Sequence, residues 1–144
     1  MILDALLVLS DAQAVTADAA STNTIDLGGT NRRIGDGMPL VAMFTIDVSA
    51  DFTTTDETYS FQIIESAAAN LSSPNILAVR TVSAASAGLA AGKKVTIGIP
   101  IGTPTLRYLG VYYDVGGTTP TITVTAAIIP QSFVDEQVYY PGVF

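Results

Sequence analysis

Apolar and polar residues alternate with a period of two along much of this chain, as they do in a strand with one buried face. The clearest example is residues 121–125, where Ile122 and Val124 alternate with three threonines. The same pattern predicts half-buried strands in residues 59–63 and 95–101. In residues 38–48, the predicted buried face carries Leu40, Ala42, Phe44, Ile46 and Val48, and in residues 95–101 it carries Val95, Ile97, Ile99 and Ile101.

Further strand patterns, rich in β-branched and aromatic residues, are separated by clusters of Gly, Pro and Asn typical of turns. They occupy residues 6–10, 23–27, 76–82 and 105–115. About eight short strands predict an all-β fold, an antiparallel jelly-roll-like sandwich that forms a single domain over residues 1–144. The alanine-rich residues 67–71 and 83–91 are expected to form single helical turns at most.

Residues 105–115 depart from the alternation because both faces of the strand carry large side chains. Leu106, Tyr108 and Tyr112 share one face, and Leu109, Val111, Tyr113 and Val115 share the other. A strand of this kind is buried on both sides. One face would join the core, and the other would be covered by a loop, a terminal arm or another protein chain.

The composition excludes most catalytic machinery. The 144 residues are 49% hydrophobic and contain no His, Cys or Trp. A chain without His and Cys has no Ser-His-Asp triad, no cysteine nucleophile and no zinc site of the usual kind. We therefore expect a protein that is not an enzyme and binds no cofactor.

The charge excludes two classes of partner. Six Lys and Arg against 13 Asp and Glu give a net charge of -7, the wrong sign for neutralising phosphates. Nucleic acid and anionic membranes are therefore not expected as direct partners. Residues 5–9 resemble a signal peptide only faintly, because no basic residue precedes them and Asp4 adjoins them. We expect them to belong to the mature fold.

Carboxylates remain the one possible source of acid-base chemistry. Asp51, Asp56 and Glu57 lie close together in a threonine-rich segment, and Glu65 follows in the next strand. A glycosidase needs two carboxyls about 5–10 Å apart in a cleft. A solvated loop is the simpler interpretation, and a loop calcium site is a third.

Three segments are candidates for protein contacts. Residues 28–37 form a glycine-rich loop in which two adjacent arginines either dock an acidic partner or are simply solvated. Residues 1–9 and 137–144 are apolar or aromatic ends that favour interface arms over free tails, although packing on their own domain is an alternative. The candidate interface residues are Ile2, Leu3, Leu6, Leu7, Arg32, Arg33, Tyr139, Tyr140, Val143 and Phe144.

Four segments in order carry a family resemblance: residues 9–16, 21–28, 107–115 and 123–129. In order and spacing the chain resembles the capsid cement, or decoration, proteins of tailed bacteriophages of the Bordetella-phage type. The resemblance implies a jelly-roll-like fold, pairing into homodimers with a trimer as the alternative, and no enzyme activity. It also implies synthesis in the host cytoplasm and binding to the major capsid protein on the outer capsid surface of the virion.

A carbohydrate-binding or adhesin-like β-sandwich is the alternative function, since sandwiches host many such sites. It would require aromatic rings exposed together on one concave face. The rings available for it are Tyr108, Tyr112, Tyr113, Tyr139 and Tyr140.

Overall fold

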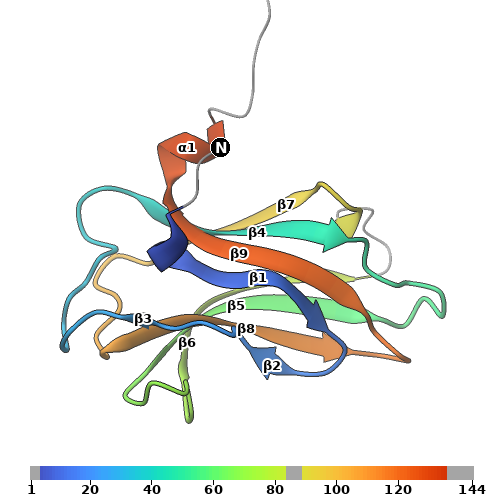
Figure 1. Cartoon of the computed structure of the whole chain (residues 1–144), viewed down its shortest axis with the longest axis horizontal. Coiled ribbons are helices and arrows are strands. Elements are labelled where there is room, and N and C mark those ends of the chain that lie inside the picture. Colours follow the sequence, from blue (N-terminus) through green and yellow to red (C-terminus); the bar gives the residue numbers. More distant parts are fainter. Residues whose placement is uncertain (1–3, 84–88, 136–144) are drawn as a thin grey trace, which may run out of the picture.

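Two antiparallel β-sheets pack face to face in the structure, a computed structural model that describes residues 4–83 and 89–135 (Figure 1). Sheet A has the order β1-β9-β4-β7, and sheet B has the order β2-β8-β5-β6, with β3 also paired to β8. The strands of sheet A are β1 (Val8–Val15), β9 (Ile122–Pro130), β4 (Leu40–Val48) and β7 (Lys94–Gly98). Those of sheet B are β2 (Ala19–Ala20), β3 (Ile25–Asp26), β8 (Tyr108–Gly116), β5 (Thr58–Ser66) and β6 (Asn75–Ser83).

The connectivity is that of a jelly roll. Strands β2 and β3 pair with the same edge of β8, so they act as one interrupted strand. Counted this way, eight strands form two four-stranded sheets, which is the jelly-roll arrangement. The predicted all-β sandwich of about eight strands is confirmed. No helix in the described residues has the length and apolar character to cross a membrane.

Three aromatic rings fill the centre of the core between the sheets. Phe44 of β4 lies 5.0 Å from Phe61 of β5 and 6.0 Å from Tyr113 of β8, measured between ring centroids. Phe61 and Tyr113 meet edge to face at 6.1 Å. Such tilted and edge-on contacts add to the free energy gained from burial. The centre of the core is therefore built from the predicted inward faces of β4 and β5 and from one of the two apolar faces predicted for β8.

Two residues predicted to point inward are exposed. Val48 leaves the core because the pairing of β4 with β9 shifts register between Ile46 and Val48. Ile101 is exposed because β7 ends at Gly98, so that this residue lies in the turn that follows. In both cases the alternation continues in the sequence after the strand geometry has changed.

Strand boundaries also differ from the prediction near the N-terminus. The strand expected at residues 6–10 begins at Val8, because Asp4 caps a short 3-10 helix, η1 (Ala5–Leu7), by accepting from the Leu6 amide at 2.9 Å. It continues to Val15. The strand expected at residues 23–27 shortens to β3, while β2 and the helix α1 (Gln131–Asp135) were not predicted. Residues 67–71 form a turn, as expected, and the expected turn at residues 83–91 falls partly outside the described residues.

The second face of β8 is covered in part by a loop. Leu71, in the turn between β5 and β6, is buried and packs so closely over Gly110 that a side chain there would collide with it. Tyr108 and Tyr112 on the same face stay partly exposed. Of the three alternatives for this face, the loop is confirmed at Gly110.

Candidate interaction surface

Both ends of the described chain lie toward one end of the sandwich, the left-hand end in Figure 1. Leu40 at the start of β4 pairs with Pro130 at the end of β9, so η1, α1 and the loop before β4 share this end. The loops after β5 and β7 also reach it. We call this end the terminal face and define it by its exposed apolar and cationic side chains: Leu6, Arg32, Arg33, Met38, Ile101 and Phe133.

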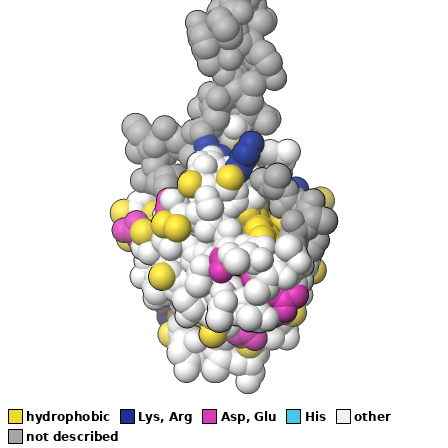
Figure 2. All heavy atoms as spheres, turned by 90° about the vertical axis from the view of Figure 1, so that its right-hand side faces the viewer, with side chains coloured by type: hydrophobic (Ala, Val, Ile, Leu, Met, Phe, Trp, Pro, Cys, Tyr) yellow, Lys and Arg dark blue, Asp and Glu magenta, His cyan; other side chains and the backbone are white. Residues whose placement is uncertain are grey.

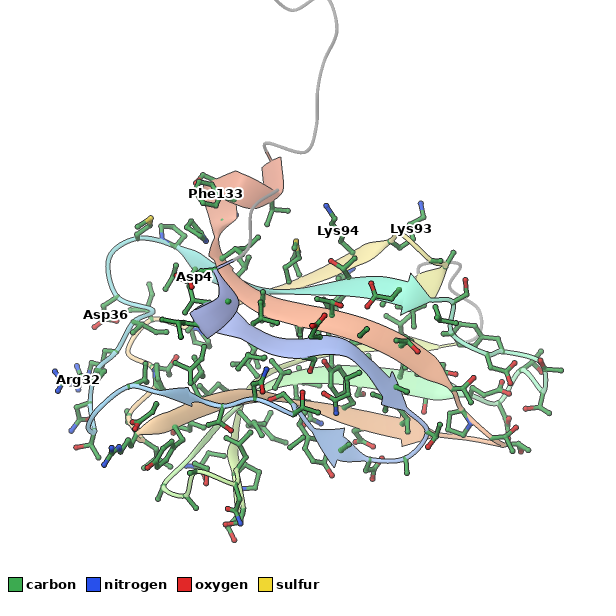
Figure 3. All side chains as sticks on the ribbon, viewed as in Figure 1. Asp4, Arg32, Asp36, Lys93, Lys94 and Phe133 are labelled. Carbon is green, nitrogen blue, oxygen red and sulfur yellow. The ribbon has the colours of Figure 1, made fainter. Side chains whose placement is uncertain are left out.

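The two arginines of the terminal face stand on a fixed loop. Backbone amides donate from Asn31 to the Thr105 carbonyl at 2.8 Å, from Arg33 to Pro104 at 3.1 Å and from Gly35 to Thr103 at 2.9 Å. Figure 3 shows Arg32 and Asp36 on this loop, with Phe133 above them on α1. A loop already held in place loses less conformational entropy when a partner binds. Arg32 and Arg33 are both exposed there.

A third arginine near this end is already engaged. Arg107 donates to both carboxylate oxygens of Asp26, at 2.7 and 2.9 Å. This hydrogen bonding and charge lower the pKa of Asp26 to about 2. The pair is solvent-exposed and ties β3 to the start of β8. Arg32 and Arg33 are consequently better candidates than Arg107 for contacting an acidic partner.

Glu65 fixes residues 103–106, the segment that holds the loop with Arg32 and Arg33, which we call the arginine loop. It is only 4% exposed, and its Oε2 accepts from the amides of Thr105 at 2.7 Å and Leu106 at 3.1 Å. Desolvation alone would raise the pKa of Glu65, but these donors outweigh it and the pKa lies below its ordinary value. The buried carboxylate is thus a structural anchor.

Large apolar side chains project from the terminal face into solvent. Ile101 is 86% exposed, Leu6 84%, Met38 63% and Phe133 41%. Beneath them, Val134 of α1 packs with Val8 against an apolar cluster on the outer face of sheet A, formed by Val41, Met43, Ala127 and Ile129. Exposed apolar side chains grouped on one surface in this way are typical of protein contact sites.

The structure brings together part of the predicted interface set. Leu6, Arg32 and Arg33 lie on the terminal face, whereas Leu7 is partly buried against the core and is better explained by packing. Ile2, Leu3, Tyr139, Tyr140, Val143 and Phe144 lie outside the described residues.

Three residues of the terminal face were not predicted from the sequence as contact residues. Met38 and Ile101 stand in turns between Gly and Pro, so an apolar residue inside a turn signal would have identified them. Phe133 follows the last strand in a helix whose five residues are too few to show a helical period.

The carboxylates do not assemble into one site. Glu57 precedes β5 and Glu65 lies near its end, so at about 3.3 Å per residue the strand separates them by about 26 Å. Asp51, Asp56 and Glu57 lie at the end opposite the terminal face, where Figure 2 shows acidic side chains in separate places. Across residues 4–83 and 89–135, no three acidic, His or Cys side chains are grouped to hold a metal ion.

The acidic segment is more ordered than the solvated loop that was expected. Asp56 accepts from the Thr118 amide at 3.1 Å and from its hydroxyl at 2.9 Å. Glu57 is buried, with Oε1 accepting from the Thr54 amide at 3.1 Å and Oε2 without a hydrogen-bond partner among the described residues. For Glu57 the expectation of a solvated side chain is wrong, because the adjoining loop closes over it.

The tyrosines considered for a sugar-binding surface differ in exposure within the described residues. Tyr113 is buried in the core and donates to Ser10. Tyr108 and Tyr112 lie four residues apart on β8 with Leu71 packed between them over Gly110. Tyr139 and Tyr140 lie outside the described residues.

Comparison with known proteins gives one family. A family model described as Bbp16 matches residues 9–129, from β1 through nearly all of β9. The loop with Arg32 and Arg33 lies inside the match, and η1 and α1 lie outside it. No curated protein matches the sequence.

Proposed function

Since the chain belongs to the Bbp16 family, whose name points to a protein of a Bordetella phage, we propose that it is a structural protein of a phage virion. In this proposal it binds the outer surface of an icosahedral capsid and stabilises the shell by bridging neighbouring copies of the major capsid protein. The chain is made in the host cytoplasm, pairs as a homodimer and catalyses no reaction.

The observation that carries the proposal is the convergence at the terminal face. Two exposed arginines on a fixed loop lie at the same end as four exposed apolar side chains, which are Leu6, Met38, Ile101 and Phe133. Interfaces combine apolar and aromatic anchors with arginine in this way. Two exposed arginines beside exposed apolar side chains, on a protein whose net charge is -7, are suited to one oriented contact.

Binding of the protein would stabilise the capsid shell by mass action. A protein that binds the assembled shell and not the dissociated subunits shifts the equilibrium toward the shell. A paired copy contacts two capsid subunits, so its second contact forms at a high effective concentration. Repeated over equivalent sites, modest contacts resist the pressure of packaged DNA without any chemistry.

The test is co-sedimentation of the purified protein with capsids stripped of their decoration, counting bound copies per shell. We expect saturation at a fixed number of copies and a higher temperature of capsid disruption after binding. Folded protein that fails to bind stripped capsids at any concentration would exclude the proposal and direct attention to the carbohydrate-binding alternative, which a glycan array would then examine.

A further inference from the structure

A mostly apolar cavity opens on the terminal face beside the first residue of α1. It lies between residues 35–40, residues 98–101 and Gln131, and its volume is about 280 Å³. Small-molecule sites usually occupy about 300–1,000 Å³, so this cavity suits one or two side chains better than a cofactor. Gly37 and Gly98 contribute no side chain to its walls, which leaves the backbone open to an occupant.

The chemistry of the walls favours an apolar occupant. The apolar side chains of the lining are those of Pro39, Leu40, Ile99 and Ile101. The one acidic side chain, Asp36, is engaged because its Oδ1 accepts from the Gly102 amide. Ile101 stands at the rim and is largely exposed, so an occupant that covers it would remove apolar surface from water.

A segment of matching chemistry follows α1 in the sequence. Residues 136–144 follow α1 and include Val138, Tyr139, Tyr140, Val143 and Phe144. The start of α1 is held at the cavity, because the Gln131 amide donates to the Pro39 carbonyl at 3.0 Å. The five residues of α1 span about 7.5 Å, and nine extended residues reach about 30 Å, so the segment is long enough to return to the cavity.

We propose that the cavity binds an aromatic side chain of residues 136–144 from the same chain. Tethering gives this segment an effective concentration in the millimolar range, which exceeds that of any free competitor of similar chemistry. The docked segment covers Ile101 and extends the terminal face with further aromatic surface. This inference concerns the isolated protein and does not depend on capsid binding.

The absence of Trp from the chain provides the test. Two full-length variants, Tyr140→Trp and Phe144→Trp, each carry a single indole whose emission and acrylamide quenching are measured. At least one indole should emit at shorter wavelength than in the matching free peptide and be quenched several-fold less. Ile101→Asp, added to that variant, should return emission and quenching to the values of the free peptide.

A matched substitution controls for the added charge. Val48→Asp replaces another exposed apolar residue, at the opposite end of β4, and should leave the indole signal unchanged. Gly98→Leu, where an added Cβ meets no neighbouring atom within 4 Å, should displace the indole by extending a side chain into the cavity. Emission typical of water in both Trp variants, or protection that survives Ile101→Asp and Gly98→Leu, would overturn the proposal. Protection that appears only as protein concentration rises would show a second copy as the occupant and overturn it too.

Discussion

The hydroxyl of Tyr113 donates a 2.8 Å hydrogen bond to the Ser10 Oγ, which joins β8 of one sheet to β1 of the other inside the core. Ser10 in turn donates to Gln13 Oε1 at 2.6 Å, and Gln13 Nε2 donates to the Ala20 carbonyl at 2.9 Å. Burial raises the pKa of Tyr113 far above its ordinary value, so the phenol stays protonated and remains a donor. A polar chain therefore links both sheets through an otherwise apolar interior.

Replacing Tyr113 with Phe should weaken this link. The substitution keeps the ring contacts with Phe44 and Phe61 but removes one buried hydrogen bond, which costs about 1–2 kcal/mol. The free energy of unfolding from denaturant titration measures the loss. Tyr112→Phe, on the partly exposed face of the same strand, is the control and should change stability by less than about 0.5 kcal/mol. Equal losses in the two variants would contradict the assigned role of the buried hydroxyl.

Protonation of Glu65 should account for part of the stability that the protein loses in acid. Its pKa is lower in the folded protein than in the unfolded chain, so the unfolded chain takes up a proton first as pH falls. The stabilisation is complete above the ordinary glutamate pKa of about 4.3 and declines as pH drops toward the lower folded value. Unfolding measured between neutral and acidic pH should show a shallower decline in Glu65→Gln, which also loses about 1–3 kcal/mol at neutral pH. Asp114→Asn, at an exposed position, should keep the steep decline of the parent protein.

Two glycines that line the cavity should respond oppositely to alanine. A Cβ at Gly35 would collide with the backbone carbonyl of Pro100, which cannot move without disturbing the loop after β7. Gly35→Ala should therefore cost about 1–3 kcal/mol, as overpacking does. Gly98→Ala meets no atom within 4 Å and should be neutral or slightly stabilising, because alanine restricts the unfolded chain. Thermal melts compare the two, and a stable Gly35→Ala protein would show that the two loops are not in contact.

The orientation of β9 can be checked at neighbouring positions. Val124 is completely buried, so Val124→Asp places an unpaired charge in the core and should prevent folding. Ile122→Asp should do the same. Thr123→Asp points to the other face, which is partly exposed, and should leave a folded protein by circular dichroism. A folded Val124→Asp protein would require a different register for this strand.

Charge reversal at two pairs of cations should show whether capsid binding uses the terminal face. Arg32→Glu combined with Arg33→Glu should weaken capsid binding in the co-sedimentation assay, with the effect fading as salt screens the charges. Lys93→Glu combined with Lys94→Glu makes the same change of net charge around the other end of sheet A, where Figure 3 shows both lysines, and should bind like the parent. Equal losses for the two pairs would indicate a general charge effect and contradict a contact through the terminal face.

The alternation of residue types predicted the strands wherever one face meets the core continuously. It identified Ile122 and Val124 correctly because β9 lies inside sheet A and keeps its register with β1 along that stretch. It failed at Val48 and Ile101, since a bulge and a strand end depend on the neighbouring strand and leave no mark in local periodicity. The two-residue β2 was missed because two alanines show no pattern at all.

The candidate surface was predicted only in part for a related reason. Local composition alone identified Arg32 and Arg33, because they form a charged pair in a glycine-rich loop. Their fixed position depends on amides that donate to residues 103–105, about 70 positions away in the chain. The convergence of that loop with η1 and α1 follows from the jelly-roll connectivity, which no single segment encodes.

The placement of Asp4 and Asp135 at one end of the sandwich has a practical consequence for protein display. A peptide fused beyond either residue would emerge on the terminal face, where it would crowd the cavity and the arginine loop. The turn around Thr118 and Thr119 lies at the opposite end, is exposed, and connects β8 to β9 outside both strands. Foreign epitopes inserted there would point away from whatever surface the terminal face covers, and each bound copy would present them outward.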